Sequence, residues 1–322
     1  MLINQELDLE NKISILQNKL LLLRRNRRQL NKNDVLEVDE TVKKEYVLRK
    51  KKGENIDPLI EKIDLETLVG SETFEKVLNI DDNLTINKTV IRGKELLFHT
   101  PNMRSLWQSF GQEMIEPELL DFIDQIPISG VFVDIGASTG IFTIYAASTK
   151  KHTYCFEPEV ANFNILNTNN YLNFKKTQKY LHAFNLAISN KNETSTLYIK
   201  HYEPSAHQKI VGKNETRDGL FKFNAEYKQR VLCLTLDQFC SIEKIKPTDV
   251  KIDVDGSELD VIEGMQKTLK SKSLKRIFLE VSEKEKSSLD ALSNILKFGF
   301  SIKLRKRVQN YFNEYNYVLV RD

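Results

Sequence analysis

Residues 131–140, which read VFVDIGASTG, constrain the fold more than any other stretch of this chain. A run of β-branched and aromatic residues ends at Asp134, and Gly136 and Gly140 bracket a short turn before the apolar run 141–147. This pattern predicts a strand, a tight loop and the start of a helix. Glycine allows a ligand to approach the backbone closely, and free amides at a helix N-terminus face such a ligand. We therefore expect an open α/β sheet with a nucleotide-like ligand near residue 136.

The spacing of the glycines indicates which ligand. A dinucleotide-binding loop has the pattern G-x-G-x-x-G, but Ser138 and Ile141 stand where its second and third glycines would be. The pattern found here, D-x-G-x-x-x-G, fits enzymes that bind S-adenosylmethionine, which has no pyrophosphate. A second predicted strand, 152–157, ends at Glu157, and Pro158 suits the first turn of the next helix. A carboxylate at that strand end can accept hydrogen bonds from both ribose hydroxyls.

Five segments, in order, resemble the landmarks of the FkbM-type methyltransferases, and the resemblance covers about residues 100–322. Ser138 stands where Asn is common in that family, and Asp255 stands where Glu is common. The resemblance implies methyl transfer from S-adenosylmethionine to an alcohol group of a sugar, glycan or secondary metabolite. The five segments are 134–140, 156–158, 185–189, 234–237 and 251–258.

The same segments imply where the cofactor binds. The residues expected to contact it are Asp134, Gly136, Ala137, Ser138, Gly140, Glu157 and Ala187.

Methyl transfer needs alignment of the acceptor with the methyl group, and an alcohol must also lose its proton to a base. Val250, Ile252 and Val254 alternate as a short predicted strand that Gly256 ends. Asp253, Asp255 and Glu258 are expected to gather at the carboxyl end of this strand, so they are candidate catalytic residues. Crowded carboxylates can raise one pKa toward that of a useful base, or they can share a divalent ion. We expect a base and no metal, because the cluster lacks D-x-x-D-N-type spacing and a nearby histidine.

Strand and helix patterns alternate through the rest of this region, which predicts a mostly parallel sheet with helices on both faces. Two adjacent terminal strands predict an antiparallel hairpin. We therefore expect the class I methyltransferase (Rossmann-like) fold with seven strands. The additional strands are predicted at 180–187, 275–281, 300–304 and 315–320, and helices at 161–171 and 284–297. A helix is also expected after Ser257, which can cap it, with Leu259, Ile262, Met265 and Leu269 on its buried face.

Two further side chains are weaker candidates for the substrate site. Glu280 lies near the end of the predicted fifth strand, where it either reaches the substrate or is solvated. The polar segment 203–226 is long for a connection without structure, so we interpret it as a substrate lid. Its His207 is either a base or an exposed loop residue.

The N-terminal region differs from the rest. Leucines recur every seven residues from Leu2 to Leu30, which predicts a coiled-coil helix over 1–30 and a possible homo-oligomer. The basic cluster 24–28 follows the apolar part, so a signal peptide is not indicated, and a solvated helix face is favoured over binding to lipid or nucleic acid. Residues 31–80 are too charged to bury a core and are predicted to be a linker or loosely packed helices.

The methyltransferase domain is expected over 81–322, with its Rossmann-like core at 130–322. Within it, 84–127 is predicted to hold a hairpin centred on Arg92 and Gly93 and a helix that begins near Pro117. Trp107, the only tryptophan, is expected to pack in the core.

Composition restricts partners and compartment. The net charge of +3 provides no strong field for nucleic acid, and 40% hydrophobic residues suffice for a core. No apolar run approaches the length that spans a bilayer. The three cysteines lack C-x-x-C spacing, which favours neither zinc nor disulfides and indicates the cytoplasm.

Two alternatives to an O-methyltransferase remain. Nucleic-acid amine methyltransferases carry an N/D-P-P-Y/F loop after the fourth strand, whereas this chain has Asp253-Val-Asp-Gly. A non-catalytic module that only binds cofactor is opposed by the intact Gly136, Gly140, Glu157 and Asp253.

Overall fold

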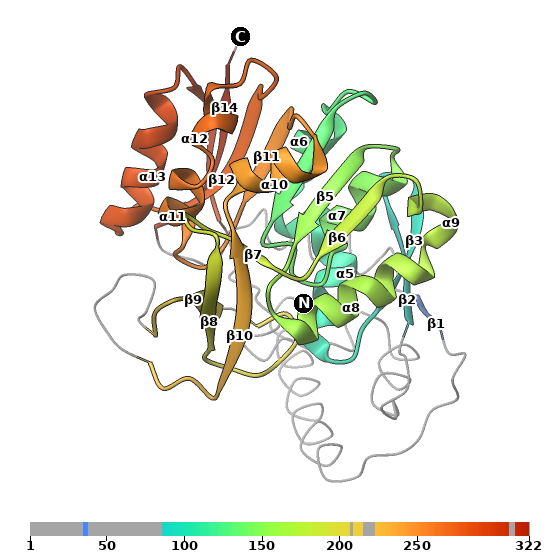
Figure 1. The fold of residues 1–322 in the computed structure, drawn as a ribbon. Helices are drawn as coiled ribbons and strands as arrows, with labels where there is room; N and C mark the ends of the chain where they lie inside the picture. Colours follow the sequence, from blue (N-terminus) through green and yellow to red (C-terminus); the bar gives the residue numbers. More distant parts are fainter. Residues whose placement is uncertain (1–34, 38–85, 207–208, 215–222, 309–312, 322) are drawn as a thin grey trace, which may run out of the picture. The chain divides into compact units, whose positions relative to one another are not determined.

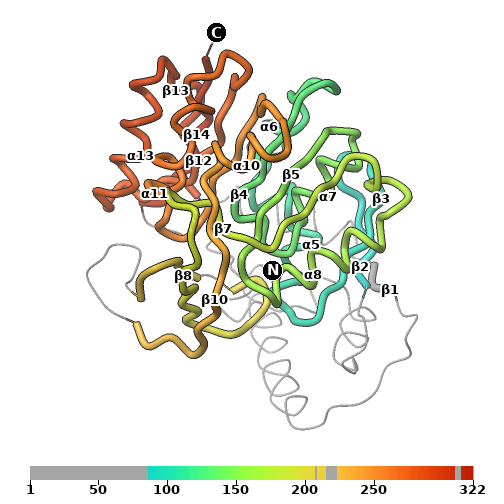
Figure 2. Tube along the Cα trace, viewed as in Figure 1, coloured from blue at the N-terminus to red at the C-terminus, as the bar shows by residue number. Residues whose placement is uncertain are grey.

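The computed structural model describes residues 35–37, 86–206, 209–214, 223–308 and 313–321. The chain divides into two compact units, Met1–Met114 and Ile115–Asp322. Figure 1 labels most of the described helices and strands, and Figure 2 labels β4 and β13. The predicted coiled coil, nearly all of the predicted charged segment and His207 lie outside the described residues.

The first unit contains a three-stranded sheet with the order β1-β2-β3. β2 and β3 pair antiparallel across Arg92 and Gly93, whose φ angles of 45° and 77° are those of a tight hairpin turn. The predicted hairpin is confirmed. Trp107 is 5% exposed and packs edge-on against Phe110, as expected of a core residue. The elements are β1 (Val35–Glu37), β2 (Ile86–Ile91), β3 (Lys94–His99) and α5 (Met103–Ile115), whose last residue belongs to the second unit.

The second unit is built around a seven-stranded sheet with the order β13-β14-β12-β11-β4-β5-β6. Only β14 runs against the other strands, because it pairs antiparallel with both β12 and β13. The predicted α/β fold with a mostly parallel sheet is therefore confirmed, and the terminal hairpin inserts its second strand inside the sheet. The tube in Figure 2 follows this path. The strands are β4 (Val131–Ile135), β5 (His152–Phe156), β6 (Leu181–Phe184), β11 (Asp249–Ile252), β12 (Arg276–Ser282), β13 (Ser301–Arg307) and β14 (Glu314–Val320).

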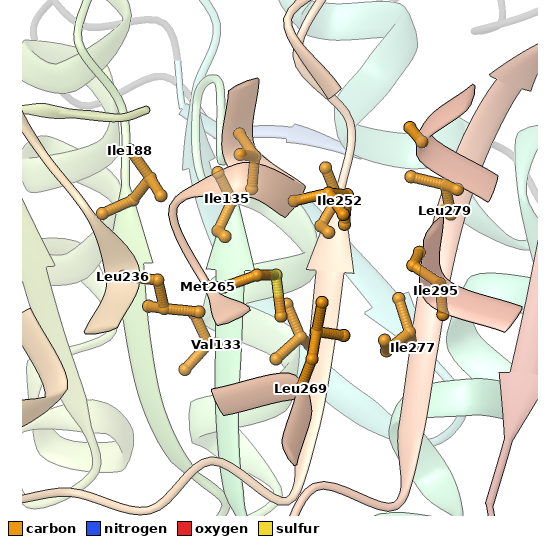
Figure 3. Packing of buried hydrophobic residues seen from close by; sticks show 14 of the residues in the cluster. Val133, Ile135, Ile188, Leu236, Ile252, Met265, Leu269, Ile277, Leu279 and Ile295 are labelled. Atoms are coloured by element: carbon orange, nitrogen blue, oxygen red, sulfur yellow. The ribbon is translucent and has the colours of Figure 1, made fainter. Parts of the chain in front are cut away.

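Helices cover both faces of this sheet. On one face, α10 to α13 pack against strand residues such as Val133 and Ile277 in a single hydrophobic cluster, part of which Figure 3 shows. On the other face, Phe122 of α6 contacts Phe132 and Phe278, which alternate along their strands with that cluster. The helices are α6 (Pro117–Asp124), α7 (Ile141–Ser148), α8 (Val160–Leu172), α9 (Phe174–Thr177), α10 (Leu236–Glu243), α11 (Glu258–Glu263), α12 (Gln266–Lys270) and α13 (Lys286–Leu296).

The second unit also contains a smaller sheet with the order β7-β10-β8-β9. The single strand predicted at 180–187 is two strands in the structure, β6 in the main sheet and β7 in this smaller one. Asn185 donates its side-chain amide to the carbonyl oxygens of Glu157 (2.8 Å) and Pro158 (3.1 Å), and the chain leaves the main sheet there. Ala187 therefore pairs with Cys233 of the smaller sheet. The strands are β7 (Ala187–Ile188), β8 (Glu193–Ile199), β9 (Lys209–Val211) and β10 (Tyr227–Leu234).

All three cysteines of the chain are free thiols. Among the described residues, no helix is long and apolar enough to cross a bilayer.

The single helix predicted after Ser257 is instead two short helices, α11 and α12, separated at Gly264 and Met265. A Cβ at Gly264 would lie 2.0 Å from the carbonyl oxygen of Ser189, so the helix ends where two backbones touch. The carboxylate of Asp237 then accepts the amides of Lys267 and Thr268, both at 2.7 Å, and starts the second helix.

We predict that Gly264→Ala lowers the unfolding free energy by about 2 kcal/mol or more, because the new methyl group forces two backbone segments apart. Urea titration followed by circular dichroism measures the change. Lys267→Ala, an exposed position in the next turn, is the control and should change stability by less than about 0.5 kcal/mol. Equal stabilities for the two variants would contradict this account of the break.

Candidate active site

The loop after β4 has the conformation that its glycines predict. Gly136 and Gly140 both have φ of 81°, and Ser138 between them has φ of 50°. A Cβ at Gly136 would lie 1.9 Å from the carbonyl oxygen of Asp253, so only glycine fits where this loop crosses the end of β11. The amides of Gly136 and Ala137 donate to Phe156 at 3.0 Å, and α7 starts directly after Gly140 without a side-chain cap. Free amides at that helix start are available to a ligand.

Glu157 joins the loop after β5 to the loop after β4. Its carboxylate accepts hydrogen bonds from the amides of Ser138 (2.8 Å) and Glu159 (2.9 Å), and the residue is 6% exposed. Burial raises the pKa of Glu157 to about 7, although both amides and the ammonium group of Lys209 act in the opposite direction. Pro158 is not in the first turn of α8 as predicted, because Glu159 caps that helix through the amides of Ala161 and Asn162.

A buried lysine, to which the sequence analysis assigned no role, organises the centre of the site. Lys251 lies on β11, between β4 and β12, and its ammonium group is 3.1 Å from Asp134 and 3.4 Å from Asp253. It also donates to the carbonyl oxygen of Gly136 at 2.8 Å. Burial alone would lower the pKa of Lys251, but the neighbouring carboxylates outweigh burial and raise it. The residue is therefore a fixed positive charge beneath the loop. The sequence signal that could have identified it is a lysine between Val250 and Ile252 in a short apolar strand pattern.

Asp134 is held from two sides. One carboxylate oxygen faces Lys251, and the other accepts a short hydrogen bond from the hydroxyl of Thr143 on α7. The carboxylate is 1% exposed. Asp134 therefore fixes the lysine and the start of α7, and its side chain is directed into the protein.

The three predicted catalytic carboxylates are not equivalent in the structure. The side chain of Asp253 is 33% exposed and lies at the end of β11, beside the β4 loop, as expected. Asp255, at φ of 41°, accepts the amide of Lys209 at 3.3 Å, and the carboxylate of Glu258 accepts the amide of Gly256 at 3.0 Å while 1% exposed. Of the three, Asp253 belongs to the lysine cluster, which consists of Lys251, Asp134, Asp253 and the carbonyl oxygen of Gly136. Asp255 and Glu258 instead hold the loop that follows β11.

The expectation that Ser257 caps the next helix is wrong. Ser257 occupies the N-cap position of α11, but its buried hydroxyl has no hydrogen-bond partner and does not cap the helix. Among the described residues, no group of three or more His, Cys, Asp and Glu side chains could hold a metal ion.

Glu116 is a candidate functional residue that the sequence analysis missed. It directly precedes α6, is partly buried, and accepts a hydrogen bond from the amide of Asn316 at 3.2 Å. Burial is the largest factor that raises its pKa to about 7; the charges of Asp253 and Glu118 add to this, while Lys251 and Asn316 oppose it. Because Glu116 comes before the first core strand and belongs to no motif, only the folded chain brings it into the electrostatic environment of Asp253.

The side chains next to Glu116 hold it in place. Asn316 of β14 also donates to Glu118 at 2.8 Å, and Lys306 of β13 lies 2.6 Å from the same carboxylate. Glu280, the weaker candidate on β12, is paired with Asn316 in the strand register. The inserted strand β14 therefore supports the Glu116 side of the site.

Part of the predicted lid is a strand. β9 pairs with β8, and Lys209, its first residue, reaches the carboxylate of Glu159 at 3.1 Å. The described part of 203–226 is therefore attached to the loop that carries Glu157.

Three solved structures that are similar to this chain illustrate the comparison. A methyltransferase FkbM from Methylobacillus flagellatus KT is 16% identical with a TM-score of 0.43, and the match covers 59% of this chain but only 44% of that one. Magnesium protoporphyrin IX methyltransferase from Synechocystis PCC 6803, with bound SAM, is 9% identical with a TM-score of 0.41, covering 69% of this chain and 85% of that one. TYW2 from M. jannaschii, in complex with AdoMet, is 15% identical with a TM-score of 0.38, covering 75% and 88%.

A family model provides the stronger comparison. No curated protein matches the chain. The model of the methyltransferase FkbM domain matches residues 134–318, which is more than half of the chain and includes the β4 loop, Glu157 and the Lys251 cluster. This chain therefore belongs to the FkbM methyltransferase family.

Proposed function

We propose that the protein is an S-adenosylmethionine-dependent O-methyltransferase that acts on a hydroxyl group of a sugar, a glycan or a secondary metabolite. The main support is the carboxylate of Glu116, because burial and the charge of Asp253 raise its pKa to about 7 although Lys251 acts in the opposite direction. A hydroxyl acceptor must lose its proton during the reaction, and a base with a pKa near the working pH is the most effective acceptor of that proton.

Three features of the site fit this cofactor. The β4 loop has no Cβ at Gly136 and Gly140, the amides at the start of α7 lack a side-chain cap, and Glu157 offers a buried carboxylate to hydroxyl donors. We assign cofactor binding to Asp134, Gly136, Ala137, Ser138, Gly140, Glu157 and Ala187. Asp134 acts indirectly in this assignment, because its carboxylate fixes Lys251 and Thr143.

When bound, S-adenosylmethionine supplies a methyl group on a positively charged sulfur, so the protein mainly orients the acceptor and removes its proton. In the proposed reaction, Asp253 orients the acceptor hydroxyl, and the ammonium group of Lys251, 3.4 Å away, holds its carboxylate in place. Glu116 and Asp253 interact electrostatically, so the two carboxylates share the proton that the acceptor hydroxyl loses. After the methyl transfer, Glu116 carries this proton. Asp255 and Glu258 shape the loop through the amides of Lys209 and Gly256.

We predict that Glu157→Ala weakens binding of S-adenosylhomocysteine by on the order of 1 to 3 kcal/mol, because the ribose hydroxyls lose a charged acceptor. Isothermal titration calorimetry measures the dissociation constants. Glu263→Ala, on the exposed end of α11, is the control and should bind like the wild type. An unchanged dissociation constant for Glu157→Ala would remove the ribose assignment.

We predict that Asp253→Asn lowers kcat by roughly 100-fold or more while leaving the affinity for S-adenosylhomocysteine nearly unchanged. The amide keeps the shape of the carboxylate but not its charge. Turnover is measured with labelled S-adenosylmethionine and an acceptor found by screening hydroxyl-bearing sugars and metabolites. Asp260→Asn is the matched control, because Asp260 accepts a hydrogen bond from the side-chain amide of Asn190 and lies outside the lysine cluster. If Asp253→Asn turns over like the wild type, the chemistry belongs to another residue.

The raised pKa of Glu116 is testable without an acceptor. In the folded protein Glu116 titrates near 7 instead of 4.5, so folding takes up a proton between these values and wild-type stability falls as pH rises through that window. We predict that Glu116→Gln removes this loss, and that its stability relative to the wild type improves by about 1 to 3 kcal/mol between about pH 4 and pH 8.

Chemical denaturation at several pH values measures this difference. Glu243→Gln at the end of α10, an exposed residue, is the control and should follow the wild-type curve. Parallel curves for wild type and Glu116→Gln would show that Glu116 titrates normally, and the proton would need another acceptor.

A further inference from the structure

The side chain of Lys209 connects the small sheet to the candidate cofactor site. Its ammonium group lies 3.1 Å from the carboxylate of Glu159 and donates to the carbonyl oxygen of Glu203 at 3.2 Å. The side chains of Lys209 and Glu159 are 7% and 1% exposed, so both charges are almost completely removed from solvent. A buried ion pair of this kind strongly affects its neighbours, because little water screens it.

The backbone of the same segment is attached to both loops of the site. The amide of Lys209 donates to Asp255 at 3.3 Å, in the loop after β11. The amide of Ser205 donates to the side chain of Asn162 at 2.9 Å, in the first turn of α8. The described part of the segment therefore bridges the loop that carries Asp253 and the helix start next to Glu157.

The charges around Glu157 explain why a lysine is placed there. Glu159 lies two residues away and donates its backbone amide to one Glu157 oxygen, and both residues are buried. The charged and titratable groups that act on Glu157 are Glu159 and Lys209, and the nearby thiol of Cys155 is buried and its pKa is raised. Lys209 lowers the pKa of Glu157, whereas Glu159 raises it.

We infer that Lys209 is a positioning residue of the cofactor site, which fastens β9 to both loops and supplies the positive charge that offsets Glu159 beside Glu157. This inference rests on the proposed function, in which ionised Glu157 binds the ribose of the cofactor. An ionised carboxylate accepts two hydroxyl donors more strongly than a protonated one. The affinity for the cofactor is therefore highest where Glu157 is ionised and falls as pH decreases through the pKa of Glu157 in the free protein, which is about 7.

The test is calorimetric titration of the full-length protein with S-adenosylhomocysteine between about pH 6 and pH 9, the range around the pKa of Glu157. For Lys209→Met, the pH at which affinity declines should move upward by on the order of one unit, and affinity near pH 7 should fall by about tenfold. Glu159→Gln should move the profile in the opposite direction, because Lys209 then acts on Glu157 without a competing carboxylate. The glutamine oxygen can still cap α8.

Two further variants distinguish an electrostatic effect on Glu157 from misfolding of the protein. Lys209→Met/Glu159→Gln removes both charges of the buried ion pair together, and its profile should return to that of the wild type. Lys213→Met, an exposed lysine in the same connection, is the matched control and should leave the profile unchanged.

The outcomes separate this inference from the proposed function. If the wild type binds S-adenosylhomocysteine and all variants show the same pH dependence, the role of Lys209 is overturned and the function stands. A uniform loss of affinity in Lys209→Met that the double variant does not reverse would also overturn it. If the wild type does not bind S-adenosylhomocysteine at any pH, the proposed function fails and this inference fails with it.

Discussion

The site depends on one buried cation. Lys251 lies in the middle strand of a seven-stranded sheet, where an uncompensated ammonium group would be prohibitively costly. Asp134, Asp253 and the carbonyl oxygen of Gly136 compensate it, so the lysine fixes the ends of β4 and β11 relative to each other. Removal of one member of such a cluster leaves a buried charge, which is why we treat the cluster as a unit. The orientation of Asp253 follows from it.

Around this cation, carboxylates hold backbone amides and thereby shape the loops. Glu157 binds the amide of Ser138, Glu258 binds that of Gly256, and Asp255 binds that of Lys209. Each contact joins a loop to itself or to a neighbouring loop, and loops at strand ends need such contacts because they lack ladder hydrogen bonds. Acidic residues that look like a catalytic cluster in the sequence are therefore divided in the structure. Only Asp253 faces the lysine cluster, and its electrostatic partner Glu116 comes from a distant part of the chain.

Local patterns predicted much of the fold, for reasons visible in particular elements. The hairpin at Arg92 and Gly93, the helix that begins at Pro117 and the strand around Val250 and Ile252 each depend on short-range periodicity or turn chemistry. Errors arose where a distant contact overrode the local pattern. Asn185 bonds to the β5 loop and divides one predicted strand, and the close approach of Gly264 to Ser189 divides one predicted helix.

The sequence by itself determined the order of strands and helices, the glycine loop after β4 and the carboxylates at the strand ends, because these are fixed by residues within a few positions of one another. It also indicated the family, through the five ordered segments between 134 and 258, and the family model that matches 134–318 confirms it. Only the tertiary structure decided that Lys251 is buried between two aspartates, that burial and the charge of Asp253 raise the pKa of Glu116, and that Lys209 reaches Glu159. Burial and charge neighbours arise from segments distant in the chain, and a pKa depends on both, so no local pattern could have specified them.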